Sequence, residues 1–344
     1  MVGALVVLLA SSAFGSSAAS SSSSHGEKPT KLTVLCTVEE PWCAAQTAAF
    51  ESETGIPTEF VRLSGGEALT ELKNTKDKPG FSVWWGGSAD GYVAAQADGL
   101  LEPYKSPNAA KVPADSKDRN GSWTGIYVGA LGFCSNKAKL AEAGVAAPRS
   151  WKALLNPALA GQVSIAHPAT SGTAFTALWT LMTLNKLDQD ATFKYLAALD
   201  KNVSEYTASG SAPVEAVAQG TATVGVVFAH DCVSAIADGA DNLVLTFPRE
   251  GTGSEIGATA VIKNGPDPAA AKMWIDWALT AKAQEIPPTV KSYELPTNPS
   301  AKVSDKSVKL AEIKLVDYDF IKSAAQKKAI TEKFDADIAP APKQ

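Results

Sequence analysis

Residues 162–184 read QVSIAHPATSGTAFTALWTLMTL, and their pattern indicates the fold class. It begins with a short apolar strand at 162–166 and passes through Ser171 and Gly172 into a helix predicted over 173–184. The N–H groups in the first turn of a helix have no acceptor within the helix, and the helix dipole is positive there. The stretch therefore predicts an α/β fold with an anion-binding helix start; ordinary capping by Ser171 is the alternative.

The alternation of strand and helix continues in both directions along the chain. Toward the N-terminus, apolar patterns predict strands at 32–36, 56–63, 82–85 and 124–134, and helices at 41–54, 67–76, 92–98 and 137–143. Toward the C-terminus they predict helices at 191–199, 213–218 and 269–284, strands at 223–229 and 256–263, and a polar helical tail from 304. Mostly apolar strands in such an order indicate parallel or mixed sheets covered by helices on both faces.

Composition limits the classes of function. The chain has 344 residues, 45% of them apolar and 19% charged, which fits two ordinary lobes better than one large core. The net charge of -5 provides no basic surface for a phosphate backbone, so nucleic acid is not expected as a partner. With only three histidines, a zinc site of several imidazoles is not expected, and no cofactor is predicted.

The first residues are typical of an exported protein. The apolar run 4–10, ALVVLLA, is too short to span a bilayer and matches the core of a signal peptide, although no Lys or Arg precedes it. Cleavage is expected between Gly15 and His25, within or near a serine-rich linker at 16–24. These features predict a periplasmic protein.

Four cysteines are an even number in a chain of this kind, which permits disulfides without requiring them. Cys36 and Cys43 are close enough in sequence to bridge a loop. Cys134 and Cys232 each follow an apolar run and could be bonded or remain buried thiols. The pairing stays open at this point.

Further candidate ligand contacts lie where strands end. Two more Ser-Gly helix starts, one at Ser64 and Gly65 and one from Ser209 to Ser211, suggest anion capture without the glycine patterns of nucleotide-binding loops. His230 and Asp231 follow the strand 223–229, where open α/β sheets place ligand contacts. The strand-end position also makes Glu39 a candidate, and a glycine-rich loop makes Glu255 one.

An enzymatic role for these side chains is the competing interpretation. His230 could act as the acid or base of a phosphatase. However, the chain has no Gly-x-Ser-x-Gly motif, and nothing in the spacing places His230 beside a nucleophilic hydroxyl. No catalytic residue is therefore assigned.

The motifs together resemble the solute-binding proteins of ABC importers, in the branch that includes ferric-iron, 2-aminoethylphosphonate and sugar-phosphate receptors. The resemblance runs along nearly the whole mature chain. It is carried by AAFESETGIPTEFVRLSGGEAL (48–69), SVWWGGSADGYVAAQADGLLEPYKSP (82–107), PRSWKALLNPALAGQVSIAHPATSGTAFTAL (148–178), SGSAPVEAVAQGTATVGVVFAHD (209–231) and EGTGSEIGATAVIKNGPDPAAAKMWIDW (250–277).

This resemblance implies a two-lobed periplasmic-binding-protein fold of type II, in which each lobe is a mixed sheet flanked by helices and a hinge joins the lobes. The expected division is a signal peptide and linker at 1–25, a first lobe at 26–122 with 256–303, and a second lobe at 123–255 with 304–344. A receptor of this class is expected to act as a monomer that delivers its solute to a membrane permease and an ATPase.

The side chains expected at the site distinguish among the ligands of this branch. Iron receptors of this branch use an adjacent pair of tyrosines where this chain has Phe228 to Asp231, and none of its seven tyrosines is adjacent to another. The resemblance is closer to the hexose-phosphate receptors, in which His230, Asp231 and Glu255 would bind sugar hydroxyls. Ser171, Gly172 and Thr173 would then hold the phosphate. The alternative is 2-aminoethylphosphonate, whose ammonium group would pair with Asp231 or Glu255.

Overall fold

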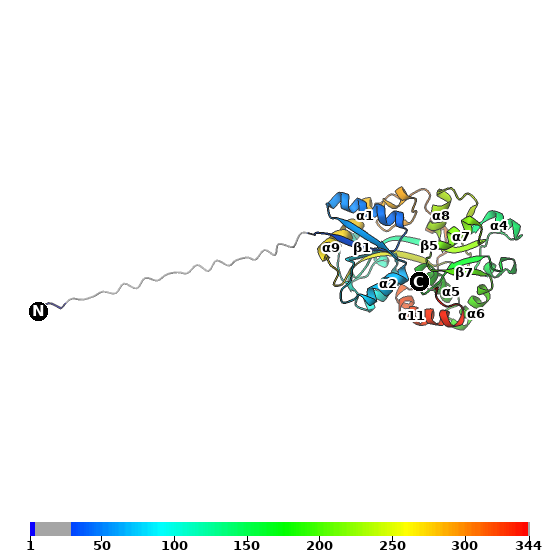
Figure 1. Ribbon diagram of the computed structural model, residues 1–344, viewed down its shortest axis with the longest axis horizontal. Coiled ribbons are helices and arrows are strands. Elements are labelled where there is room, and N and C mark those ends of the chain that lie inside the picture. The colour runs from blue at the N-terminus through cyan, green and yellow to red at the C-terminus, as the bar shows by residue number, and fades with distance from the viewer. Residues whose placement is uncertain (4–28, 343–344) are drawn as a thin grey trace.

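The chain folds into two halves that share one mixed β-sheet (Figure 1). The computed structural model describes residues 1–3 and 29–342. The predicted signal-peptide core at 4–10 and the serine-rich segment at 16–24 lie outside these residues. Within the described residues, we find no helix with the length and apolar character needed to cross a membrane.

The first half contains the strands on one side of the sheet and the helices that cover them. Its elements are β1 (Leu32–Cys36), α1 (Glu40–Thr54), β2 (Thr58–Arg62), α2 (Gly65–Asn74), β3 (Val83–Ser88), α3 (Ala89–Ala97), β4 (Leu101–Glu102), β10 (Ser254–Ile262), α9 (Pro268–Ala278), α10 (Ala281–Gln284) and β11 (Leu295–Pro296). Side chains of α1 and α9 form the core on one face of these strands, and side chains of α2 and α3 form the core on the other.

The second half follows the same plan. Its elements are α4 (Lys137–Glu142), β6 (Val163–Ala166), α5 (Gly172–Leu184), α6 (Gln189–Asp200), β7 (Val203–Thr207), α7 (Ala212–Gln219), β8 (Val224–Phe228), α8 (Ala229–Ala237) and β9 (Leu243–Thr246). Helices α5 and α6 pack on one face of the strands, while α7 and α8 pack on the other. The sheet is parallel at β1–β2, β1–β3, β6–β7 and β6–β8 and antiparallel where β10, β5 and β8 meet.

The long strand β5 (Thr124–Asn136) belongs to both halves. Its first part pairs with β10 as far as Ala130, and its second part pairs with β8 from Leu131 onward. The change from one half to the other therefore occurs inside a continuous strand, whereas the expected lobe boundary lies at 122–123. Figure 1 places β5 between the helices of the two halves.

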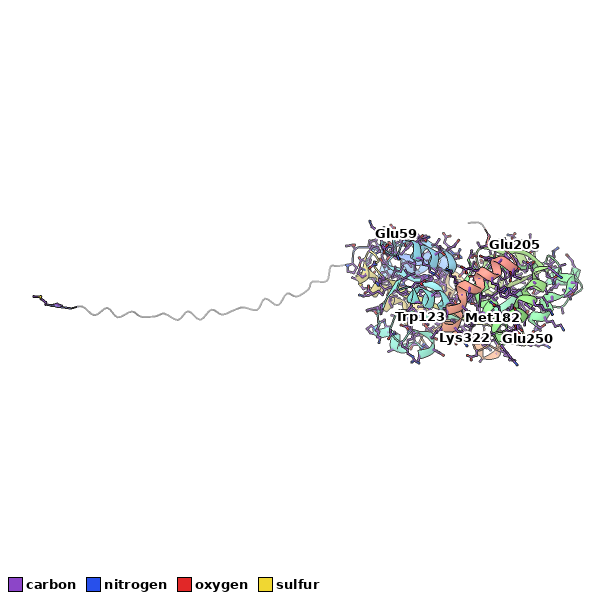
Figure 2. All side chains as sticks on the ribbon, turned by 90° about the horizontal axis from the view of Figure 1, so that it is seen from below. Glu59, Trp123, Met182, Glu205, Glu250 and Lys322 are labelled. Carbon is purple, nitrogen blue, oxygen red and sulfur yellow. A yellow bond between two sulfur atoms is a disulfide. The ribbon has the colours of Figure 1, made fainter. Side chains whose placement is uncertain are left out.

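The C-terminal helix α11 (Phe320–Asp337) contacts both halves. It packs against α3 of the first half and against α5 and α6 of the second, and seen from below it lies across their junction (Figure 2). The division expected from the sequence assigned residues 304–344 to the second lobe alone, whereas α11 contacts both halves.

Most predicted elements are confirmed within a few residues, and the differences have local causes. The tail is not helical from 304, because the long helix begins only where Asp319 accepts hydrogen bonds from the Ile321 and Lys322 N–H groups. The helix expected over 269–284 is interrupted at Thr280, which caps the separate helix α10. The strand expected over 223–229 ends at Phe228, and the unpredicted helix α8 follows at once.

Candidate functional site

A pocket lies between the two halves. Its walls are the carboxyl ends of β1, β2 and β3 from one half and of β6, β7 and β8 from the other, which is where α/β sheets place ligands. Every residue predicted as a ligand contact lines this single pocket: Glu39, Ser64, Gly65, Ser171, Gly172, Thr173, Ser209, Ser211, His230, Asp231 and Glu255.

One end of the pocket is built from helix N-termini. Ser64 precedes α2, and Ser171 precedes α5, where its hydroxyl accepts a hydrogen bond from the Ala174 N–H at 3.3 Å. The capping predicted as the alternative for Ser171 is therefore real. That bond uses only the Ala174 N–H, so the Gly172 and Thr173 N–H groups just before it in the same first turn stay available, and capping and anion binding are compatible.

Arg62 adds a full positive charge to this end, and its position is fixed from both halves. Its Nε donates to the Val38 carbonyl oxygen at 3.2 Å, and its terminal nitrogen donates to the Ser209 hydroxyl at 3.3 Å. Ser209 and Ser211 lie with their hydroxyl oxygens 3.2 Å apart. Between them, Gly210 has no room for a side chain, because a Cβ would overlap the Thr173 hydroxyl. We call this the anion end of the pocket.

Hydrogen bonds cross between the halves beside the anion end. The Ser64 hydroxyl donates to the Thr170 carbonyl at 2.7 Å, and the Gly66 N–H donates to the same oxygen at 3.1 Å. A Cβ on Gly66 would lie 2.5 Å from the Ala169 carbonyl oxygen. The starts of α2 and α5 thus face each other at close range, and these hydrogen bonds hold the two halves together on this side of the pocket.

The other end of the pocket is acidic. The His230 Nε2 atom lies 3.8 Å from a carboxylate oxygen of Asp231, 3.8 Å from one of Glu255 and 3.6 Å from one of Glu294. These side chains are nearly excluded from solvent. His230 stacks on Phe228 and meets the ring edge of Tyr127. We call His230, Asp231, Glu255 and Glu294, together with Glu39, the acidic end.

Three polar atoms of the acidic end are buried without a hydrogen-bond partner among the described residues. They are His230 Nδ1, Glu255 Oε1 and Glu294 Oε2. Burying polar groups without partners costs free energy, so such groups commonly face a ligand or ordered water. The acidic end therefore has free hydrogen-bonding capacity suited to several hydroxyl groups or to an ammonium group.

Burial controls the ionisation of the acidic end. It raises the pKa of Asp231 well above the usual range, and the negative charges of Glu39, Glu294 and Glu255 raise it further. Burial likewise raises the pKa values of Glu255 and Glu294. Burial lowers the pKa of His230 to about 3, so its imidazole is neutral at physiological pH. A neutral imidazole both donates and accepts a hydrogen bond.

Stability of the ligand-free protein is expected to fall as pH rises above the ordinary carboxyl range of about 4 to 4.5, because carboxyl groups with raised pKa values bind more protons in the folded chain than in the unfolded one. Each carboxyl that keeps its proton in the folded chain while it is ionised in the unfolded chain lowers the free energy of unfolding by about 1.4 kcal/mol per pH unit. Urea unfolding from about pH 5 to about pH 8 measures this slope. Glu294→Gln should make it shallower, and equal slopes in both proteins would contradict the assignment.

Several pocket residues were not predicted. Arg62 ends β2 and could have been found by the strand-end argument already applied to Ser64. Tyr127 lies near the start of β5, and its hydroxyl accepts a hydrogen bond from the Gly87 N–H at 3.2 Å; no local pattern distinguishes it from a core residue. Glu294 does not itself line the pocket; it contacts His230 from an irregular segment next to β11. His230 and Asp231 were expected at a strand end but lie in the first turn of α8.

The acidic end does not have the arrangement of a metal centre. Among the residues that the structure describes, no group of three or more His, Cys, Asp or Glu side chains is placed to hold a metal ion. The adjacent tyrosines of iron receptors are also missing from the sequence at this position.

This chain is similar in sequence to known proteins. Residues 91–324 match the family model described as bacterial extracellular solute-binding protein. An uncharacterized protein of Haemophilus influenzae is 36% identical over 318 residues, which is 90% of each chain.

Solved structures share the fold over almost the whole chain. The periplasmic binding protein AfuA from Actinobacillus pleuropneumoniae, with fructose-6-phosphate bound, is 32% identical, with a TM-score of 0.87 over 90% of this chain and 98% of its own. The periplasmic binding protein P5PA is 32% identical, with a TM-score of 0.85 over 90% and 99%. Iron-bound HitA from Pseudomonas aeruginosa is 19% identical, with a TM-score of 0.76 over 89% and 99%, which indicates a common fold only.

Proposed function

Because the chain belongs to the bacterial extracellular solute-binding proteins, we propose that it is a periplasmic, monomeric receptor that captures a phosphorylated sugar between its lobes and delivers it to an ABC permease. The family and the similar solved structures are binding proteins, and this chain is a solute-binding receptor of the ABC importer type rather than an enzyme. The two lobes correspond to the two halves of the type II fold, with β5 passing between them.

One observation carries the proposal: a single pocket has an anion end and an acidic end. Arg62 and the starts of α2 and α5 offer positive charge and free N–H groups to a phosphate. Asp231, Glu255 and the neutral His230 offer acceptors and a donor to hydroxyl groups. A sugar phosphate has both kinds of group on one small molecule, as does the fructose-6-phosphate that AfuA binds.

A second candidate follows from the charge of the acidic end. The pocket lining given by the described residues contains the carboxyl groups of Glu39, Asp231 and Glu255 but no lysine, and Arg62 is engaged at the anion end. An ammonium group would therefore be attracted to the acidic end. 2-Aminoethylphosphonate, with a phosphonate at one end and an ammonium at the other, is the ligand that this observation favours.

Isothermal titration of the purified protein discriminates the candidates. The ligands are fructose-6-phosphate and other hexose phosphates, the free hexoses, inorganic phosphate, 2-aminoethylphosphonate and ferric citrate. Hexose phosphates should bind at least about 100-fold more tightly than inorganic phosphate, and free hexoses should not bind measurably. A matching rise in melting temperature with ligand concentration is the control for native-state binding. Tight binding of 2-aminoethylphosphonate or ferric ion alone would overturn the sugar assignment.

A further inference from the structure

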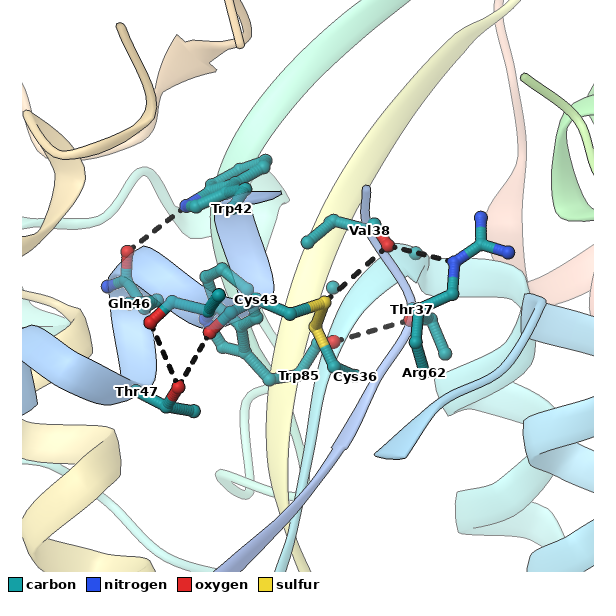
Figure 3. The surroundings of a disulfide bond; sticks show 12 residues. Cys36, Thr37, Val38, Trp42, Cys43, Gln46, Thr47, Arg62 and Trp85 are labelled. Carbon is teal, nitrogen blue, oxygen red and sulfur yellow. Dashed lines mark hydrogen bonds between the residues drawn. A yellow bond between two sulfur atoms is a disulfide. The ribbon is translucent and has the colours of Figure 1, made fainter. Parts of the chain in front are cut away.

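Both disulfides of the protein lie directly beside the acidic end of the pocket, one in each half. Cys36 closes β1 and Cys43 lies in the first turns of α1, and their bond encloses the loop 37–39. All three residues of this loop line the pocket, and the loop ends in Glu39. Figure 3 shows the bond between the loop and the helix, with Val38 and Arg62 beside it.

The loop held by this bond also supports the anion end. The Val38 carbonyl oxygen accepts the hydrogen bond from Arg62 Nε at 3.2 Å, and the Cys43 sulfur lies 3.6 Å from the same oxygen. The Thr37 hydroxyl donates to the Trp85 carbonyl at 3.3 Å. The short covalent loop therefore fixes the backbone that presents Glu39 and receives Arg62.

The second bond holds the other half of the acidic end. Cys134 is a buried residue of β5, and Cys232 follows Asp231 in the first turn of α8. The bond joins residues 98 apart in sequence and fastens the start of α8 to the strand that runs through both halves. Asp231 and His230 are thus one and two residues from a covalent anchor.

The acidic end requires such anchors. Any two of its carboxyl groups that are ionised together repel each other, and no lysine or arginine forms an ion pair with Asp231, Glu255 or Glu294 within the described part of the chain. Buried polar atoms without partners add to the tendency of these side chains to separate and take up water. Without a ligand, the packing of the loop 37–39 and of the first turn of α8 must resist this tendency.

We propose that the two disulfides are positioning elements of the ligand site, which hold Glu39 and the His230–Asp231 pair together against charge repulsion and so preserve recognition of the sugar part of the ligand. The proposal rests on the proposed function. It implies that loss of either bond weakens binding of the sugar phosphate while leaving the phosphate contacts of α5 intact. The loss should grow with pH, because more of the carboxyl groups are then ionised.

The test uses two double variants, Cys36→Ala/Cys43→Ala and Cys134→Ala/Cys232→Ala. Isothermal titration at pH 6 and pH 8 compares a hexose phosphate with inorganic phosphate. Cys134→Ala/Cys232→Ala should lose about tenfold in affinity for the hexose phosphate and change by less than about twofold for phosphate, with the larger loss at pH 8. Cys36→Ala/Cys43→Ala should also lose affinity for phosphate, because its loop receives Arg62, but its loss for the hexose phosphate should be several-fold larger. Equal losses for the two ligands in either variant, or no loss for either ligand, would overturn the proposal.

Phe193→Leu is the matched control for general destabilisation, because Phe193 is buried in the core of the second half, away from the pocket lining. It should lower the melting temperature and leave both affinities and their ratio unchanged. A changed ratio in this control would mean that loss of stability alone alters selectivity, and it would overturn the inference. The two double variants test separate bonds, so failure of one to fold leaves the other as the test.

A measurement without ligand separates this proposal from the proposed function. NMR titration of the His230 ring should give a pKa of about 3 in the wild type. In Cys134→Ala/Cys232→Ala the value should move toward the ordinary 6.5, because the ring becomes hydrated. If hexose phosphates fail to bind the wild type but this shift occurs, the sugar assignment fails and the positioning role stands. An unchanged His230 pKa in this variant would overturn the role of that bond.

Discussion

Asp231→Ala is expected to weaken hexose-phosphate binding by about 100-fold or more while weak binding of inorganic phosphate is retained. Asp231 has a nearly buried side chain at the acidic end, and its carboxyl group can form two hydrogen bonds with ligand hydroxyls. Losing the partner of a buried polar group costs about 1–3 kcal/mol, so the loss of both bonds accounts for the expected change in affinity. Isothermal titration with the hexose phosphate and with phosphate measures both effects.

The same substitution should not destabilise the ligand-free protein. Burial and the neighbouring carboxylates already raise the pKa of Asp231, which means that its ionised form is unfavourable in the folded chain. Asp238→Ala is the matched control, because Asp238 caps the other end of α8 and forms an exposed ion pair with Lys291. It should leave affinity unchanged. Full affinity in Asp231→Ala would place sugar recognition elsewhere in the pocket.

Much of the fold and of the candidate site follows from local pattern. The stretch 162–184 forms β6 and α5 as predicted, because an apolar run, a capping serine and an apolar helix each favour the same local structure. Ser64, Ser171 and Ser209 were predicted independently of one another and line one pocket. They meet because the carboxyl ends of neighbouring strands face the same crevice, which is a property of the topology.

What could not be predicted depends on contacts between distant segments. The pairing of Cys134 with Cys232 requires α8 to lie against β5, and the sequence showed no helix at 229–237. Glu294 joins His230 only because β11 pairs with β5 near Tyr127. The division of β5 between the two halves is equally invisible, since its apolar pattern continues across Leu131.

The contact between α11 and the first half also depends on distant residues. Asp90 is fully buried near the start of α3 and accepts hydrogen bonds from the hydroxyls of Ser88 at 2.8 Å, Tyr318 at 3.1 Å and Ser323. Burial raises the pKa of Asp90, and the positive charge of the half-buried Lys327 opposes this effect. Ser88 lines the ligand pocket, so one carboxylate links the pocket wall to the C-terminal segment.

Asp90→Ala is therefore expected to lower the free energy of unfolding by about 3–5 kcal/mol, because it leaves the Ser88 and Tyr318 hydroxyl groups without their acceptor and Lys327 without a nearby opposite charge. Urea unfolding followed by circular dichroism measures the change. Asp98→Ala at the end of the same helix removes an exposed ion pair with Lys73 and should cost less than about 1 kcal/mol. Equal costs for the two variants would contradict a structural role for the buried carboxylate. A loss confined to Asp90→Ala would identify it as the group that holds the C-terminal helix across the junction of the two lobes.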